Sequence, residues 1–517
     1  MHLAAHKQRP PLHPQEKWFL TIVLVQLVFL PWAFGTMHAW SQLTSLGLAA
    51  LSFVLALVPR TYSGDYAVAL GVVSKPENGN LKPEIGNTSS ALKFQPSGLG
   101  SAYRLSAWPR LIRFPLFWLG LVLLAYLGLQ AFNPSWVYTQ NTKQWWLVRV
   151  NDIPWLPTSV ETPFARFNLW RSFIIYATVW LTVCALWIGI TRRRTLHILL
   201  SLLVGNAVIL GLVGFVQKAS GEGKLLWLQS FPDASSFASF VYQNHAGAYF
   251  SLMSFAALGL AVWHFFEGRK RMARSTPAAL WLIGALLLVF AVIFSMSRGA
   301  IISLAVFGVA AVLALILLRS MSSTQSTTPT LVPVLVAFAI LGTLGFMVRE
   351  IDFSAVYFRF QQLSKLQAND PSYVSRKLAG EAAAKMYGDS WVRGVGAGGF
   401  RYLFPEYVKN KPEIYEGGKY FWEHAHNDWL EIPIELGLVG VALLVAAFGW
   451  IVWAWVRAGG LRHPLAVMIA LGAGQIMAHA LIDFPFHNPA ILVTWWALLV
   501  ISLRWLELDG GGRAAKD

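Results

Sequence analysis

The sequence predicts an all-α protein, a polytopic bundle of about twelve transmembrane helices with one large helical loop outside the membrane. Of its 517 residues, 56% are hydrophobic and 13% are charged, whereas soluble domains carry about 25% charged residues. Apolar runs recur along the chain, and each is long enough to cross a hydrocarbon layer of ~30 Å. Clusters of arginine and lysine separate alternate runs. Together these observations exclude a soluble globular protein.

The expected spans follow the apolar runs in chain order. No small-residue cleavage site follows the first run, so we expect a retained span rather than a signal peptide. The single cysteine, Cys184, lies inside an apolar run, and no disulfide framework is possible. The expected spans are residues 18–34, 38–58, 115–131, 168–190, 195–217, 243–264, 277–294, 298–318, 330–348, 428–456, 464–484 and 488–506.

Positive charge predicts the direction of the spans, because short loops rich in arginine and lysine stay in the cytoplasm. Residues 192–194 read RRR, and residues 268–274 read GRKRMAR. These loops and the basic segments near both ends of the sequence fall on one side if both termini are cytoplasmic. The formal net charge of +16 is then mostly a topology signal, and we expect no nucleic-acid partner.

The segments between the spans differ in character. The insert at 59–114 is rich in Pro, Gly, Asn and Ser, so we expect it to be poorly ordered. The largest outer loop has helical patterning around 371–391. The expected parts are the first two transmembrane helices (1–58), a cytoplasmic insert (59–114), transmembrane helices three to nine (115–348), the large outer loop (349–427), and helices ten to twelve with a cytoplasmic tail (428–517).

Residues 422–431 read WEHAHNDWLE and place titratable side chains directly before an apolar run. Ionisable groups at membrane depth are costly, so they indicate function by default. If a helix begins near His426, then Asp428, Glu431 and Glu435 share one face of it. A carboxylate beside an imidazole orients the ring and raises its pKa.

Three interpretations fit this segment. We favour a general base at the membrane surface. A structural alternative is helix capping, for which Asn427 stands at the right place. A metal site is the third, because His424 and His426 form a His-x-His pair, but no second ligand cluster of fixed spacing accompanies it. We therefore expect no metal and no cofactor.

Arg298 lies in the short outer turn FSMSRGAIISL at 294–304. An arginine in an outer turn departs from the positive-inside rule. A functional role for Arg298 is therefore as well supported as a structural one, in which its side chain snorkels to lipid headgroups. By itself, Arg376 is typical of a solvated loop charge. The run GVGAGG at 394–399 matches a dinucleotide-binding pattern, which we reject because no βαβ unit surrounds it. Its glycines are expected to turn the backbone tightly against the membrane surface.

Further polar residues are predicted at the same side of the membrane. His479 and Asp483 are expected to form interhelical hydrogen bonds, and Asn244 and His245 begin a span at its outer end. A solute transporter would also have about twelve spans, but it favours polar groups near mid-bilayer and broken helices. Clusters at outer helix ends favour an enzyme whose site opens outward.

The order of three motifs resembles the O-antigen ligase and polymerase superfamily, bacterial GT-C membrane glycosyltransferases that use undecaprenyl-diphosphate-linked glycans. The motifs are SRGA at 297–300, an arginine-led helix followed by GVGAGGF at 394–400, and HAHNDWLEIPIELGLVG at 424–440. They cover roughly residues 294–440, and the 59–114 insert has no counterpart in the resemblance. The resemblance implies a multi-pass protein of the bacterial inner membrane, with a large helical periplasmic loop and a site that faces the periplasm.

The resemblance also implies roles for the motif residues. Arg298 and Arg376 would bind the donor diphosphate, and His426 rather than His424 would take a proton from the acceptor hydroxyl, with inversion and without a metal ion. His424, Asn427, Asp428, Glu431 and Glu435 would support His426, with Glu423, Asp428 and Glu431 as the candidates that tune its ring. We favour a ligase, whose acceptor is lipid A core; a polymerase acting on a lipid-linked repeat and a protein O-oligosaccharyltransferase remain alternatives.

Overall fold

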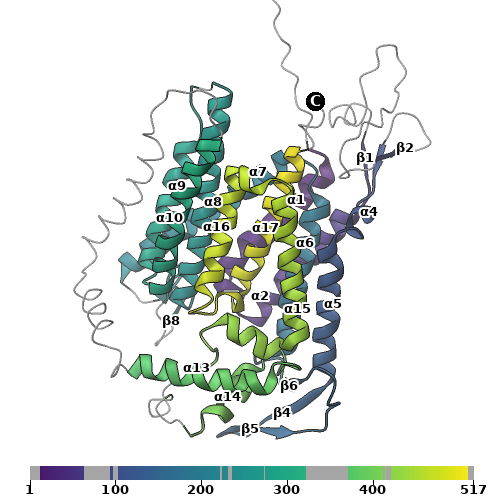
Figure 1. Ribbon diagram of the computed structural model, residues 1–517, viewed down its shortest axis with the longest axis vertical. Coiled ribbons are helices and arrows are strands. Elements are labelled where there is room, and N and C mark those ends of the chain that lie inside the picture. Colours follow the sequence, from purple (N-terminus) through teal and green to yellow (C-terminus); the bar gives the residue numbers. More distant parts are fainter. Residues whose placement is uncertain are drawn as a thin grey trace, which may run out of the picture.

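The computed structural model confirms that the protein is mostly helical (Figure 1). Long helices pack side by side in a bundle, and short strands lie at its two ends. The structure describes residues 12–62, 94–96, 103–221, 224–230, 236–272, 274–321, 371–410, 414 and 421–510.

Among these residues, eight helices are long and apolar enough to cross a membrane. They are α2 (Ala39–Leu57), α5 (Pro115–Phe132), α6 (Leu169–Gly189), α7 (Arg193–Ser220), α8 (Gln243–Lys270), α10 (Arg298–Met321), α15 (Asp428–Arg457) and α17 (Pro489–Gly510).

Three further helices coincide with expected spans but are not among these eight. Two are apolar and shorter, α9 (Ala278–Phe294) and α16 (Pro464–His479), and the third is α1 (Pro14–Trp32). The expected span at 330–348 lies outside the described residues. The bundle of membrane helices is therefore confirmed, and the count of twelve is not.

The helices divide into an inner and an outer set. Within their most apolar windows, 89% of α8 and 83% of α17 are buried inside the protein, against 22% of α10 and of α15. Small residues allow close approach in the centre: Gly472 of α16 lies against Phe255 of α8, where an added Cβ would come within 2.7 Å of the Phe255 Cβ. The outer helices present apolar side chains to the surroundings, as lipid contact requires.

Two helix ends follow familiar local chemistry. The Asn168 side chain caps α6 by accepting a hydrogen bond of 3.0 Å from the Arg171 backbone N–H. Helix α7 ends at Gly221, whose φ of +68° lies in the left-handed region that glycine adopts without strain.

Most of the 59–114 insert, which was expected to be poorly ordered, lies outside the described residues, namely 63–93 and 97–102. Its described residues form a three-stranded antiparallel sheet with the order β1-β3-β2. Its strands are β1 (Arg60–Tyr62), β2 (Phe94–Pro96) and β3 (Tyr103–Leu105), and helix α4 (Trp108–Leu111) follows. A buried ion pair of 3.2 Å between Arg60 and Glu16 fastens the first strand to α1. Strands of three residues are too short for periodicity to reveal.

A second layer closes the opposite end of the bundle (Figure 1). We call it the cap: strands β4 (Pro134–Gln140), β5 (Trp145–Arg149) and β6 (Ser159–Glu161) with helices α13 (Pro371–Ser390) and α14 (Phe400–Val408). Its sheet has the order β5-β4-β6, with β4 antiparallel to β5 and parallel to β6. Helix α13 confirms the helix predicted around 371–391.

The cap has its own apolar core, in which Tyr138 and Val160 of the sheet pack with Phe400, Phe404 and Ile434. Strands from residues 134–161 and helices from the large outer loop thus form one layer against α15. The insert sheet and the C-terminal end of α17 lie at the other end of the bundle (Figure 1). The remaining short elements are β7 (Lys224–Leu225), β8 (Gln229–Ser230), η1 (Phe34–Thr36), η3 (Gly460–Arg462) and η4 (Pro485–His487).

Candidate active site

The histidine segment at 422–427 leads into α15, where the bundle meets the cap. Helix α15 begins at Asp428, with Asn427 at the N-cap position, close to the expected start near His426. The Asn427 side chain makes no capping hydrogen bond; its backbone carbonyl instead accepts from the Glu431 N–H at 2.9 Å.

Helix α15 is broken at Gly437, whose φ of +64° and ψ of −171° are not helical. A short first segment, 428–436, therefore precedes the long apolar helix. The glycine run of 394–399 packs against this break, because the Val395 N–H donates to the Ile434 carbonyl at 2.9 Å and the Gly396 N–H to the Glu435 carbonyl at 3.0 Å.

Glycine is required at this contact. A Cβ on Gly394 would lie 2.3 Å from the Glu435 carbonyl oxygen, a distance that no side chain tolerates. The run was expected to turn the backbone tightly against the membrane surface, and Gly394, Gly396 and Gly398 have the positive φ of a tight turn. The run also donates hydrogen bonds to carbonyls that the end of the first helix segment leaves without partners.

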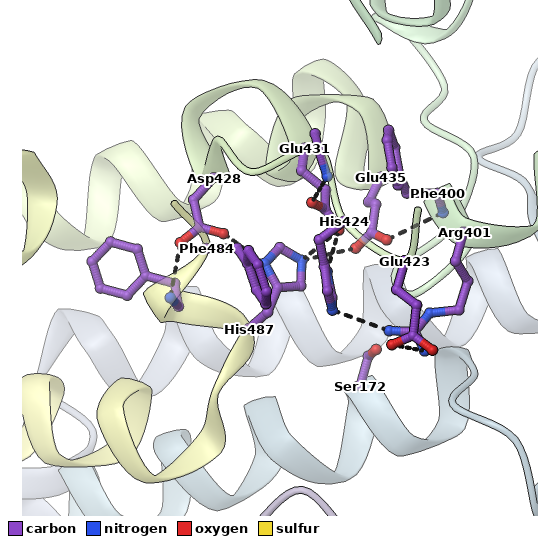
Figure 2. Close-up of polar contacts among 12 residues, drawn as sticks. Ser172, Phe400, Arg401, Glu423, His424, Asp428, Glu431, Glu435, Phe484 and His487 are labelled. Atoms are coloured by element: carbon purple, nitrogen blue, oxygen red, sulfur yellow. Dashed lines mark hydrogen bonds and ion pairs between the residues drawn. The ribbon is translucent and has the colours of Figure 1, made fainter. Parts of the chain in front are cut away.

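Three carboxylates on the first segment of α15 surround one imidazole (Figure 2). The His487 Nδ1 atom lies 2.6 Å from Asp428 Oδ1, and its Nε2 atom lies 3.3 Å from Glu431 Oε1 and 3.6 Å from Glu435 Oε2. All three acids are buried and share one face of the helix, as their spacing predicts.

His487, in η4, was not among the residues expected at the site. Burial alone would lower its pKa, but the carboxylates of Glu431 and Asp428 raise it well above the usual value for histidine. Carboxylates face both ring nitrogens, an arrangement that favours the imidazolium form and offsets the buried negative charge. The only signal in the sequence was FPFHNP at 484–489, which directly follows the predicted polar pair of His479 and Asp483.

His424 is locked into the same network (Figure 2). Its Nδ1 atom lies 2.8 Å from Glu431 Oε1, and its Nε2 atom accepts a hydrogen bond of 3.2 Å from Arg401. The ring also stacks on Phe484, with centroids 4.2 Å apart. Burial lowers the His424 pKa well below its usual value, and the charges of His487 and Arg401 lower it further.

Both nitrogens of His424 are thus engaged. The neutral ring donates from Nδ1 to Glu431 and accepts at Nε2 from Arg401, so this arrangement leaves neither nitrogen open to a further partner. Arg401, on α14, was not predicted; it lies 23 positions before His424, and no spacing rule links the two residues.

His426 has a different environment. Its side chain is half-buried, and its φ of +52° places the residue in the left-handed region. Ring contacts with Trp422, Phe484 and Tyr242 have centroid distances of 5.2, 5.0 and 6.5 Å. His426 is therefore partly exposed at the rim, although its Nδ1 atom is buried.

The ends of α8, α10 and α16 meet at the same corner. Asp483, just past α16, accepts hydrogen bonds from Asn244 of α8 and, at 3.4 Å, from the Tyr242 hydroxyl. The backbone N–H of Asp428 donates to the Ala480 carbonyl at 2.9 Å. Polar groups expected at outer helix ends thus converge, although the ring nitrogens of His479 have no hydrogen-bond partner among the described residues.

Arg298 is the first residue of α10, and its side chain is exposed. Its neighbour Gly299 lies against His479, where a Cβ would approach the Nε2 atom to 2.9 Å. Because α16 also supports the start of α15, Arg298 and the histidine segment border the same helix end. Arg376 lies on α13 in the cap; its side chain is outside the part of the chain that the structure describes.

Donor atoms of His424, Glu431 and His487 lie within 4.8 Å of one another, close enough to hold a metal ion. The His-x-His pair was expected to lack a second ligand cluster of fixed spacing. His487 joins His424 and Glu431 from a distant segment, whereas His426 is not part of the group. In this arrangement His424 donates its Nδ1 proton to Glu431, and both ring nitrogens of His487 face carboxylates. A metal would have to displace the ring protons.

Residues 283–445 match the family described as O-antigen ligase. No curated protein matches the chain. The matched residues run from α9 into α15, and they include both predicted arginines, Arg401 and the histidine segment, whereas His487 lies beyond them. The resemblance to the O-antigen ligase superfamily is confirmed over this range.

Proposed function

Given an O-antigen ligase domain at residues 283–445, we propose that the protein is a membrane glycosyltransferase of the ligase type. It moves a glycan from an undecaprenyl-diphosphate donor to a hydroxyl of lipid A core, at the periplasmic face of the bacterial inner membrane. It is a multi-pass membrane protein, and the lipid bilayer is therefore one of its partners.

One observation supports this proposal most strongly: two histidines, two positions apart, have opposite environments. His424 is buried between Glu431 and Arg401, whereas His426 is half-buried at the rim of the same segment. A network of buried charges thus fixes the segment and leaves one imidazole where a substrate can reach it. A general base needs this combination of fixed position and access.

The proposed reaction is a single displacement. His426 accepts the proton of the acceptor hydroxyl as the oxygen bonds to the anomeric carbon of the donor sugar. The bond from that carbon to the diphosphate oxygen breaks, and undecaprenyl diphosphate leaves, so the anomeric configuration inverts. Arg298 and Arg376 hold the diphosphate, because a guanidinium stays charged and offers paired donors to phosphate oxygens.

The orientation follows from the basic loops. The cap then faces the periplasm, and the insert at 59–114 faces the cytoplasm, with both termini. The two lie at opposite ends of the bundle, as this assignment requires (Figure 1).

Cysteine labelling tests the orientation. A Lys143→Cys variant, in the exposed turn between β4 and β5, should react with a membrane-impermeant thiol reagent in intact spheroplasts. Met272→Cys, at a side chain that is 90% exposed just after α8, should react only after lysis. Native Cys184 is fully buried and gives little background. Labelling of the two positions in the reverse order would invert the topology.

Reconstituted transfer tests the function itself. Purified protein in lipid nanodiscs, supplied with an undecaprenyl-diphosphate glycan, should glycosylate lipid A core, and the rate should persist in EDTA because arginines rather than a cation compensate the diphosphate charge. Products extended only on a lipid-linked repeat would identify a polymerase, and transfer to protein alone would identify an O-oligosaccharyltransferase. Loss of activity in EDTA, restored by one divalent ion, would assign a metal to His424, Glu431 and His487.

A further inference from the structure

The cap contains a pocket of about 360 Å³ between the β4–β5 hairpin and α14. Its volume falls within the range of about 300–1,000 Å³ that is typical of small-molecule sites. Five aromatic and three charged side chains line it. The charged residues are Arg166, Arg401 and Glu423.

The aromatic side chains form a continuous wall. Tyr138 and Trp145 stack with centroids 5.5 Å apart, and Tyr402 stands edge-on to both at 5.6 and 6.3 Å. Phe421 adds a further edge contact with Trp145 at 6.1 Å. Such a wall is rigid and presents flat apolar faces beside polar groups. Sugar rings, whose C–H faces are apolar and whose hydroxyls point outward, fit surfaces of this kind.

The charged side chains make the pocket electropositive. Arg166 lies 4.9 Å from the Tyr138 ring centroid, and Arg401 lies 4.9 Å from that of Phe167. Glu423 is the single acid of the lining; it approaches Arg401 to 3.5 Å, with a side chain that is 58% exposed. Two arginines against one solvated carboxylate favour a ligand that carries negative charge.

The pocket is joined to the candidate active site by a shared residue. Arg401 lines the pocket and also donates to the Nε2 atom of His424. Glu423, at the pocket edge, directly precedes His424 in the chain, and His426 follows two positions later. A molecule in the pocket therefore lies beside the segment that carries the proposed base.

We propose that this pocket binds an anionic sugar, bearing a carboxylate or a phosphate, that forms part of the glycan acceptor. The aromatic wall receives the sugar ring, and Arg166 with Arg401 receives its negative charge. The pocket thereby selects acceptors and presents a neighbouring hydroxyl to His426. This inference rests on the proposed function, because it takes the bound glycan to be the acceptor of that reaction.

Binding of small glycans tests the pocket without requiring transfer. Full-length protein in nanodiscs is titrated with trigalacturonate, glucose 6-phosphate and neutral maltotriose, and saturation-transfer NMR reports affinity. We expect at least one anionic probe to bind roughly tenfold more tightly than maltotriose, the ratio that one charge-assisted contact of about 1.4 kcal/mol provides. The tighter of the two anionic probes identifies carboxylate or phosphate as the recognised group.

A matched pair of variants locates the binding. Arg166→Gln should weaken binding of the anionic probe by about tenfold and leave the affinity for maltotriose unchanged. Arg149→Gln is the control, because Arg149 is an exposed arginine of the same hairpin that lies over Trp136 and outside the pocket lining. Equal affinity for neutral and anionic probes, or an effect of Arg166→Gln no larger than that of Arg149→Gln, would overturn the inference.

Failure of the pocket assignment can be distinguished from failure of the proposed function. Failure of all three probes to bind, with transfer to lipid A core intact, would remove only the pocket assignment. Pocket binding without any glycan transfer would leave an anionic-sugar site in a protein whose proposed reaction is wrong.

Discussion

Replacing His426 with asparagine should lower the rate of glycan transfer by about 10²–10⁴-fold, the usual contribution of a positioned general base. Asparagine suits this backbone, because residue 426 has a φ of +52° and asparagine enters the left-handed region more readily than most residues. The variant thus removes the imidazole with little change in folding. Single-turnover transfer in nanodiscs measures the rate.

Two other histidines serve as controls for this variant. His424→Gln should lower the melting temperature as well as the rate, because His424 joins Glu431 to Arg401. His38→Asn, at an exposed side chain, should change neither. A normal rate in His426→Asn would remove the base assignment and leave the histidine segment with a structural role only.

Replacing His487 with alanine should destabilise the protein by about 3–5 kcal/mol, the usual cost of removing one partner from a buried ion pair. The change leaves three buried carboxylates on α15 without the imidazolium that they surround. Thermal unfolding in nanodiscs should show the loss as a lower melting temperature. The exposed His38→Ala variant should stay within about 0.5 kcal/mol of the wild type.

The same network predicts a pH dependence of stability. Because the folded-state pKa of His487 lies well above its usual value, its contribution is fully present below the unfolded-state pKa of about 6.5 and is lost as the pH rises through the folded-state pKa. The melting temperature should therefore decline on the alkaline side, and His487→Gln should lack this part of the decline.

Equal stability of wild type and His487→Ala would show that the carboxylates do not depend on the imidazolium.

Local periodicity was enough to predict much of the fold. Apolar runs located the membrane helices, and the three-and-four spacing of Asp428, Glu431 and Glu435 placed them on one face because it matches the helical repeat. The break at Gly437 was not predicted, since a single glycine inside an apolar run is also compatible with a continuous helix. Its cause is tertiary: the run at 394–399 hydrogen-bonds to the carbonyls at 434 and 435.

The missing parts of the site come from distant segments. His487 follows Asp428 by 59 positions, and Arg401 precedes His424 by 23. No helical or strand repeat relates such pairs, so only the fold brings them together. The cap sheet was missed for a related reason. Strand β4 pairs with β6 although β5 comes between them in the sequence, and burial does not alternate along β4 as it does in a half-buried strand.

Donor affinity separates the two proposed halves of the site most directly. Equilibrium binding of an undecaprenyl-diphosphate glycan is measured with wild type, His426→Asn and Arg298→Lys. We expect His426→Asn to bind like the wild type, because its imidazole acts on the acceptor, and Arg298→Lys to bind about tenfold more weakly, because lysine keeps the charge and loses the paired donors. If His426→Asn weakened donor binding as much as Arg298→Lys, the division between an acceptor base and a diphosphate clamp would be contradicted.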